Sequence, residues 1–160
     1  MAAPEIKIDL NLQAVLDNLK AGLESIKDTR KRTRVACNSL VEELKQNERV
    51  CYMALEYDLE ISAILPKFSR AIYDEICNSG VKLTAFRDKR ISVRKSLEGT
   101  VFASWQGKPT AKLIRKTYDK ITELVEFYPI APSEKIRSKQ RLRNIKARIG
   151  MLLDTLDCDK

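Results

Sequence analysis

Residues 12–44, LQAVLDNLKAGLESIKDTRKRTRVACNSLVEEL, carry the pattern that decides the fold. Apolar residues recur there at alternating steps of four and three, the repeat of an α-helix that buries one seam. The spacing predicts one long helix that begins after Asn11, a suitable N-cap, and runs for about 35 residues. The seam positions are Leu12, Leu16, Leu19, Leu23, Ile26, Arg30, Thr33, Cys37, Leu40 and Leu44.

The middle of this seam is polar, because Arg30 and Thr33 occupy positions that elsewhere hold apolar side chains. One interpretation is a polar layer inside the helical bundle. The other is a helix end that leaves the bundle at this point and contacts another molecule. The sequence leaves both interpretations open.

The chain after the seam predicts several shorter helices. No Gly or Pro interrupts residues 23–65, and a single helix over that whole span would be unusually long for a globular domain. We therefore expect a tight turn near 46–48 and a second helix over about 49–65, which Pro66 kinks or restarts. Asn78-Ser79-Gly80 predicts a helix end, and Thr84 a cap for a helix that reaches Leu97.

The C-terminal part predicts a helical hairpin. Prolines at 109, 129 and 132 bracket two segments with helical periodicity, and the short connection predicts that the two helices are antiparallel neighbours. The apolar stripe of the last helix is Leu142, Ile145, Ile149, Leu152 and Leu156.

Two short segments have the alternation or composition of β-structure. Ile6, Ile8 and Leu10 alternate with polar residues, and 100–105 is β-rich and aromatic, a strand or a packed loop. We expect a single all-α domain over 1–160, an antiparallel bundle of about five helices with a long N-terminal helix and at most a short β pair of 6–10 with 100–105. The domain divides into an extended arm at 1–10, near-neutral helices at 11–80 and a basic helical half at 81–160.

Charge is concentrated in that second half. The chain carries a net charge of +8, while residues 81–148 hold 18 basic and 6 acidic groups. Such a segment is typical of a surface for an anionic partner, although a solvated helix face is the commoner explanation of a charge run. The candidate anion- or partner-binding residues are Arg30, Lys31, Arg34, Lys112, Arg115, Lys116, Lys135, Arg137, Lys139, Arg141, Arg143, Lys146 and Arg148.

Composition argues against several chemistries. The chain has no histidine, so Ser-His and Cys-His nucleophile pairs are excluded. Its four cysteines form no C-x-x-C motif, which disfavours a zinc site, and we expect all four to be reduced thiols packed as small apolar groups. We find no catalytic residues, metal ligands, cofactor motif or small-molecule substrate site. No signal peptide or membrane-spanning segment is recognisable, and we expect a cytoplasmic protein.

These observations favour a non-catalytic interaction or regulatory protein. We expect it to dock a protein partner or to associate with itself, with a basic C-terminal half suited to an acidic partner. One alternative is binding of nucleic acid through its phosphate backbone. A further alternative is binding to an anionic membrane surface.

Overall fold

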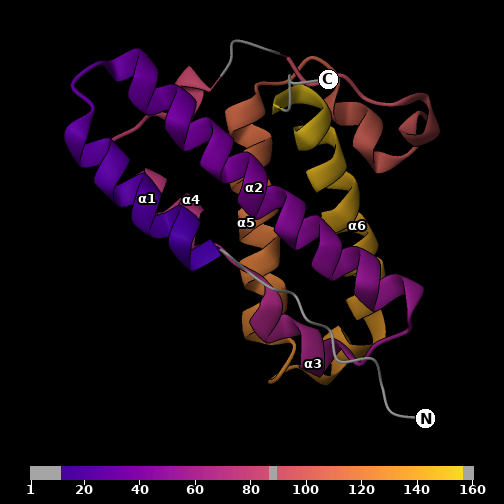
Figure 1. Cartoon of the computed structure of the whole chain (residues 1–160). Coiled ribbons are helices and arrows are strands. Elements are labelled where there is room, and N and C mark those ends of the chain that lie inside the picture. The colour runs from indigo at the N-terminus through magenta and orange to yellow at the C-terminus, as the bar shows by residue number, and fades with distance from the viewer. Residues whose placement is uncertain (1–11, 87–89, 157–160) are drawn as a thin grey trace.

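The computed structural model describes residues 12–86 and 90–156, except for the side chains of 132–136. Within those ranges the chain is an all-α antiparallel bundle, and it contains no β-strand. Figure 1 shows α2 lying diagonally across the pair α5 and α6, with α1 alongside α2. None of the helices in these ranges has the length and apolarity required to cross a lipid bilayer.

The predicted long N-terminal helix is wrong in its boundaries, because the chain folds back on itself at 26–28. α1 spans Leu12–Ser25 and α2 spans Thr29–Glu56. Asp28 has an extended conformation, and its side chain accepts a hydrogen bond from the backbone N–H of Arg30, 2.9 Å away, so it caps α2. The two helices then pack together, with Gly22 facing Val35 across the hairpin. The chain therefore breaks where the apolar seam becomes polar.

The turn expected near 46–48 is also wrong, since α2 continues through these residues. Gln46 and Asn47 are buried in the middle of the helix. α2 instead ends at Glu56, followed by Asp58 with a positive φ of 49°. Only the short helix α3 (Ile61–Ile64) and a 3-10 turn over Leu65–Lys67 occupy the rest of the expected second helix. α4 follows at Ala71–Asn78 and ends where the sequence predicts.

The C-terminal hairpin is confirmed. α5 spans Thr110–Phe127 and α6 spans Pro132–Leu156, the boundaries that the prolines predict. The whole apolar stripe of α6 is buried. α6 packs antiparallel to α2 along most of its length: Gly150 lies against Glu48, Lys146 against Tyr52 and Lys139 against Asp58.

Between α4 and α5 the chain has little regular structure. The helix expected from Thr84 to Leu97 does not form, because the described part of this segment holds only 3-10 turns over Leu83–Ala85 and Lys95–Leu97. Residues 100–105 do not form a strand either. Thr100 caps a 3-10 helix over Val101–Trp105, and the proposed partner strand 6–10 lies outside the described residues. An isolated antiparallel β-bridge joins Arg90 to Pro109.

A buried carboxylate joins three helices of the bundle. Glu43 of α2 has no exposed surface and accepts two backbone hydrogen bonds from the first turn of α4, from Ile72 (2.8 Å) and Tyr73 (3.1 Å). The hydroxyls of Ser69 and Tyr118 donate to the same carboxylate at 2.8 and 2.7 Å. α4 has no capping side chain of its own, so Glu43 supplies the acceptors and the negative charge that a helix N-terminus favours.

Asn47, one turn further along α2, binds the backbone of the residue that leads into α4. Its side-chain amide donates to the backbone oxygen of Ser69 at 2.7 Å, and its side-chain oxygen accepts from the Ser69 N–H at 2.9 Å. The rings of Tyr73 and Tyr118 stack with centroids 4.2 Å apart. α4 is therefore anchored to α2 and α5 by hydrogen bonds as well as by apolar packing.

Replacing Glu43 by Gln tests this anchor. The amide has nearly the same shape as the carboxylate. Its NH₂ group, however, would face two donors whose hydrogen bonds a carboxylate oxygen now accepts. We expect Glu43→Gln to lower the unfolding free energy by about 1–3 kcal/mol, measured by urea denaturation near neutral pH. The matched control is Glu42→Gln, since Glu42 is exposed and pairs only with Lys45 on the same helix; its cost should stay below about 1 kcal/mol. Equal costs would contradict the anchoring role.

Stability should also depend on pH through Glu43. Burial raises the pKa of Glu43 above its ordinary value of 4.5, and its four hydrogen bonds oppose that shift only in part. A carboxyl whose pKa is higher in the folded chain contributes its full stability below about pH 4.5, and the contribution declines as pH rises through the folded-state pKa. The difference in unfolding free energy between the wild type and Glu43→Gln should therefore shrink as the pH rises above about 4.5. A growing difference would mean that the four donors outweigh burial.

Candidate functional site

The basic residues predicted to bind a partner do not form one continuous set. Arg30, Lys31 and Arg34 are exposed on the first turns of α2, and Lys112, Arg115 and Lys116 are exposed on the first half of α5. On α6, Arg141 and Arg148 lie on the flank that faces α5, and Lys139, Arg143 and Lys146 lie on the flank that faces α2. The side chain of Lys135 lies outside the described residues, and Arg137 is exposed.

A groove of about 440 Å³ lies between the start of α2 and the 3-10 turn that holds Ala85. Phe86 and Cys37 are buried and form its apolar part, while Arg30 and Arg34 contribute cationic side chains. The lining residues are Thr29, Arg30, Thr33, Arg34, Cys37, Asn38, Ala85 and Phe86.

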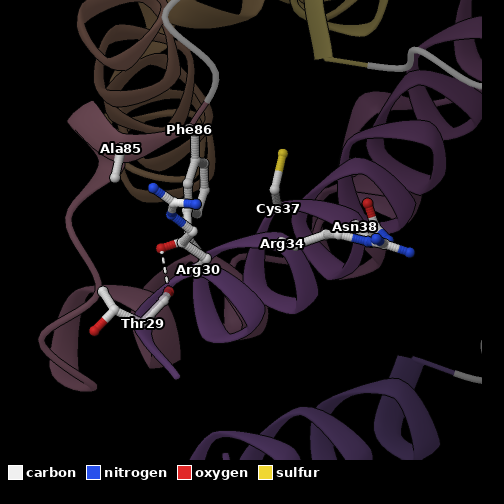
Figure 2. A pocket seen from close by; sticks show the side chains of 8 residues that line it. Thr29, Arg30, Arg34, Cys37, Asn38, Ala85 and Phe86 are labelled. Atoms are coloured by element: carbon white, nitrogen blue, oxygen red, sulfur yellow. Dashed lines mark hydrogen bonds between the residues drawn. The ribbon is translucent and has the colours of Figure 1, made fainter. Parts of the chain in front are cut away.

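Figure 2 shows how these side chains lie. The guanidinium of Arg30 lies beside the ring of Phe86, and Cys37 stands between Phe86 and the pair Arg34 and Asn38. The Thr33 hydroxyl donates to the Thr29 carbonyl at 2.9 Å. Because Arg30 is exposed, the interpretation of a polar layer inside the bundle is wrong. The polar part of the seam instead lines an open groove.

On the flank of α6 that faces α2, cationic side chains contact an acidic group and an aromatic ring. Lys139 forms an ion pair with Asp58, and Lys146 lies over the ring of Tyr52, 5.1 Å from its centroid. Arg143 is exposed beside a hollow of about 340 Å³ that Arg94, Lys146 and Glu48 also line. Arg94 is bound by Asp154 through two of its nitrogens. Much of the charge on this flank is therefore engaged within the fold.

The opposite flank of α6 forms a basic crevice with α5. The crevice has a volume of about 200 Å³ and is lined by Lys120, Arg141, Asn144, Ile145 and Arg148. Lys120 pairs with Glu123 on its own helix. Arg141 is half-buried, so three cationic side chains of two helices converge on a small, partly dehydrated space.

Arg148 is the most constrained of these cations. It is half-buried, donates to the Asn144 carbonyl at 3.1 Å, and lies over the Phe102 ring, 5.3 Å from its centroid. Its Nε atom is buried and has no hydrogen-bond partner among the residues that the structure describes. Burial lowers the pKa of Arg148, an effect that the charge of Glu123 partly offsets.

Sequence reasoning missed several residues of these two sites. Lys120 and Asn144 line the crevice, and Ala85 and Phe86 line the groove. Lys120 follows Lys116 by one turn on α5, a spacing that could have suggested it. Nothing local to Ala85 or Phe86 indicates a meeting with α2, because that contact joins segments far apart in the sequence.

The thiols differ from the expectation in one respect. Cys37 and Cys51 are buried, and burial raises the pKa of Cys51 to about 12, but Cys77 is exposed on α4. Cys158 lies outside the described residues. Within the described ranges, no group of three or more Cys, Asp or Glu side chains is placed to hold a metal ion.

No family model, curated protein or solved structure matches this chain. A helical bundle is compatible with many unrelated activities, so the candidate sites themselves carry the functional argument.

Arg148 offers a test of whether the crevice serves stability. Replacing a half-buried charge by an apolar side chain of similar length removes a dehydration cost and keeps the packing on Phe102. We expect Arg148→Met to keep an unfolding free energy within about 1 kcal/mol of the wild type, or above it, by urea denaturation. A loss of more than about 2 kcal/mol would assign Arg148 a structural role.

Proposed function

We propose that this protein is a non-catalytic interaction module that docks an acidic segment of a protein partner in the groove at the start of α2. The observation that carries the proposal is the position of Arg30 and Thr33. They interrupt an otherwise apolar seam, and they line the groove instead of the core. A seam that only stabilised the bundle would favour apolar side chains at both positions.

The groove combines two features of peptide-binding surfaces. Its volume of about 440 Å³ can take one or two large apolar side chains of a ligand, and Phe86 with Cys37 offers an apolar surface beneath them. Arg30, Lys31 and Arg34 project from the adjoining turns. Charge complementarity therefore favours a partner segment in which acidic residues flank an apolar anchor, and an amphipathic helix in a groove is one common form of such docking.

The nucleic-acid and membrane alternatives receive less support. Backbone binding to nucleic acid needs a track of cations along one path, whereas the candidate cations lie at the start of α2, on α5 and on two flanks of α6. Two on the α2-facing flank, Lys139 and Lys146, already have partners within the fold. Insertion into a lipid surface needs an exposed apolar helix face, and the apolar stripe of α6 is buried.

The direct test uses a designed helical peptide with a Leu/Phe face flanked by Glu, compared with the same peptide flanked by Lys. We expect fluorescence anisotropy to detect binding of the acidic peptide only. Arg30→Glu combined with Arg34→Glu should weaken it about tenfold or more, because two attractive charges become repulsive. The matched control, Lys112→Glu with Arg115→Glu, makes the same charge change on α5 and should leave affinity within about threefold.

Other outcomes point elsewhere. If both double variants weaken binding equally, the peptide senses only net charge and the groove is not its site. Tighter binding of duplex or single-stranded nucleic acid than of the acidic peptide would favour the nucleic-acid alternative. A concentration-dependent dimer in light scattering that Ala85→Trp disrupts would identify self-association through the groove.

Arg30→Leu separates binding from stability. Arg30 is exposed, so Leu at this position adds an apolar group beside Phe86 without leaving a charge unpaired. We expect an unchanged or higher unfolding free energy together with weaker binding of the acidic peptide. A loss of stability above about 1 kcal/mol would show that Arg30 serves the fold.

A further inference from the structure

We infer that two copies of this chain exchange α1, so that the face of α2 and α4 that α1 covers also accepts α1 of a second copy. Residues 26–28 join α1 to α2 in the single copy, and they straighten as the hinge of the exchanged dimer. α1 packs on α2 and α4. The occupant of this surface is therefore defined, because the same helix covers it in either form. The inference goes beyond the proposed docking of an acidic segment and does not rest on it.

The hinge is compatible with a continuous helix. Residues 26–28 include neither Gly nor Pro, and helical hydrogen bonds lie directly on both sides. The N–H of Ile26 donates to the Gly22 carbonyl, and the N–H of Arg32 donates to the Asp28 carbonyl, each at 3.0 Å. The break is confined to the backbone donors between Ile26 and Arg32. Straightening the hinge would give each of those donors a helical acceptor.

The apolar seam keeps its register across the hinge. Seam positions follow one another at alternating steps of four and three through residues 19–37, so a straightened chain would carry the seams of α1 and α2 along one stripe. Two long antiparallel helices pack through such a stripe. The buried residues of α1 are Leu19 and Leu23. Release of α1 from its own chain therefore exposes only a small part of the core, and α1 of the second copy covers the same part again.

The geometry of the hairpin is suited to the exchange. α1 runs antiparallel to α2 and lies alongside it (Figure 1), and Gly22 faces Val35 across the pair. That facing pair is centred on the bond between Asp28 and Thr29, within or beside the hinge. A two-fold axis at this bond would place α1 of each copy antiparallel on α2 of the other copy. The contacts within the hairpin would then be repeated between chains.

The charge of the hinge region opposes the exchange. Residues 27–34 hold five basic side chains and one acidic side chain. The two-fold axis would bring this segment of one copy beside the same segment of the other copy. Like charges placed together disfavour association, and dissolved salt screens them. The dimer should therefore become more favourable as the salt concentration rises.

The experiment measures the mass of the full chain by light scattering after size-exclusion chromatography. The protein is first held at high concentration in urea just below its unfolding transition, because exchange requires release of α1, and is then returned to buffer. We expect a dimer that dissociates slowly on dilution. The dimer fraction should rise at least about threefold between about 0.1 M and about 1 M salt, over which the Debye length falls from about 10 Å to about 3 Å.

Two substitutions of Asp28 separate the hinge from the helix cap. Both remove the side chain that accepts from the Arg30 N–H, so both lose the same cap. Asp28→Ala favours a continuous helix and should raise the dimer fraction about threefold or more. Asp28→Pro fits the φ of −79° at this position but breaks a continuous helix, and it should abolish the dimer. Insertion of Gly-Gly after Lys27 lengthens the hinge and should also lower the dimer fraction, which provides a second test if Asp28→Pro does not fold.

A disulfide identifies which chain supplies α1. A Cβ atom at position 22 would lie 3.9 Å from the Val35 Cγ1 atom, so Gly22→Cys with Val35→Cys places two thiols close enough to bond. The variant also carries Cys77→Ser and Cys158→Ser. On a non-reducing gel we expect the dimer fraction to contain chains linked in pairs and the monomer fraction to contain an internal bond. Val35→Cys alone, in the same background, should give neither product.

The inference is overturned if the dimer fraction carries the disulfide within single chains, or if neither the wild type nor Asp28→Ala forms a dimer. A dimer that Ala85→Trp disrupts and Asp28→Pro leaves intact would be self-association through the groove at the start of α2. A dimer fraction that falls as salt rises would contradict the placement of the two basic segments side by side. The peptide titration that tests docking measures none of these quantities, so the two proposals fail separately.

Discussion

The carboxylate of Glu43 is the interaction on which the arrangement of the helices depends. It has no exposed surface and lies on the face of α2 that meets α4 and α5. It accepts hydrogen bonds from two backbone N–H groups and from the hydroxyls of a serine and a tyrosine. A buried charge is tolerated only where such donors surround it. α4 therefore has one favourable position, with its N-terminus at Glu43. Apolar packing alone would allow neighbouring registers at smaller cost.

That anchor also determines where the groove opens. α4 contacts both α1 and α2, and Arg32 of α2 donates to the carbonyl of Ser79 at its C-terminal end. The segment after α4 is thereby directed past the start of α2, where Leu83 and Phe86 become buried. The groove between Phe86 and the first turns of α2 follows from this route. A structural anchor in the core thus positions a candidate docking surface near the helix end that Asp28 caps.

The distribution of charge explains why the basic C-terminal half gives two different surfaces. α6 is a single helix with its buried stripe between α2 and α5, so cations on its two sides meet different neighbours. On the α2 side they meet Asp58 and the ring of Tyr52, and nearby Arg94 meets Asp154. On the α5 side Arg141 and Arg148 share a crevice with Lys120, and Arg148 also lies over the ring of Phe102. The same helix therefore lines two crevices with different neighbours.

Periodicity and helix-ending residues were sufficient to predict much of the architecture. The all-α class, the hairpin of α5 and α6 with its boundaries, the stripe of α6 and the end of α4 all follow from local signals. The first two helices show where such signals fail. Both Asp28 and the residues at 46–48 could begin or end a helix, and no Gly or Pro decides between them. Asn47 is buried and bonded to the backbone of Ser69, and α2 continues through residues 46–48.

The sequence by itself determined the helical class, the paired C-terminal helices, the excess of positive charge and the absence of histidine chemistry, because each depends on neighbouring residues or on composition alone. Only the tertiary structure decided which charges are compensated and which face a groove or crevice. Asp58 and Lys139, Phe86 and Arg30, and Lys120 and Arg148 are far apart along the chain. Whether a cation meets an acid, an aromatic ring or another cation is settled by the packing of α2, α5 and α6, and the candidate sites arise from those long-range contacts.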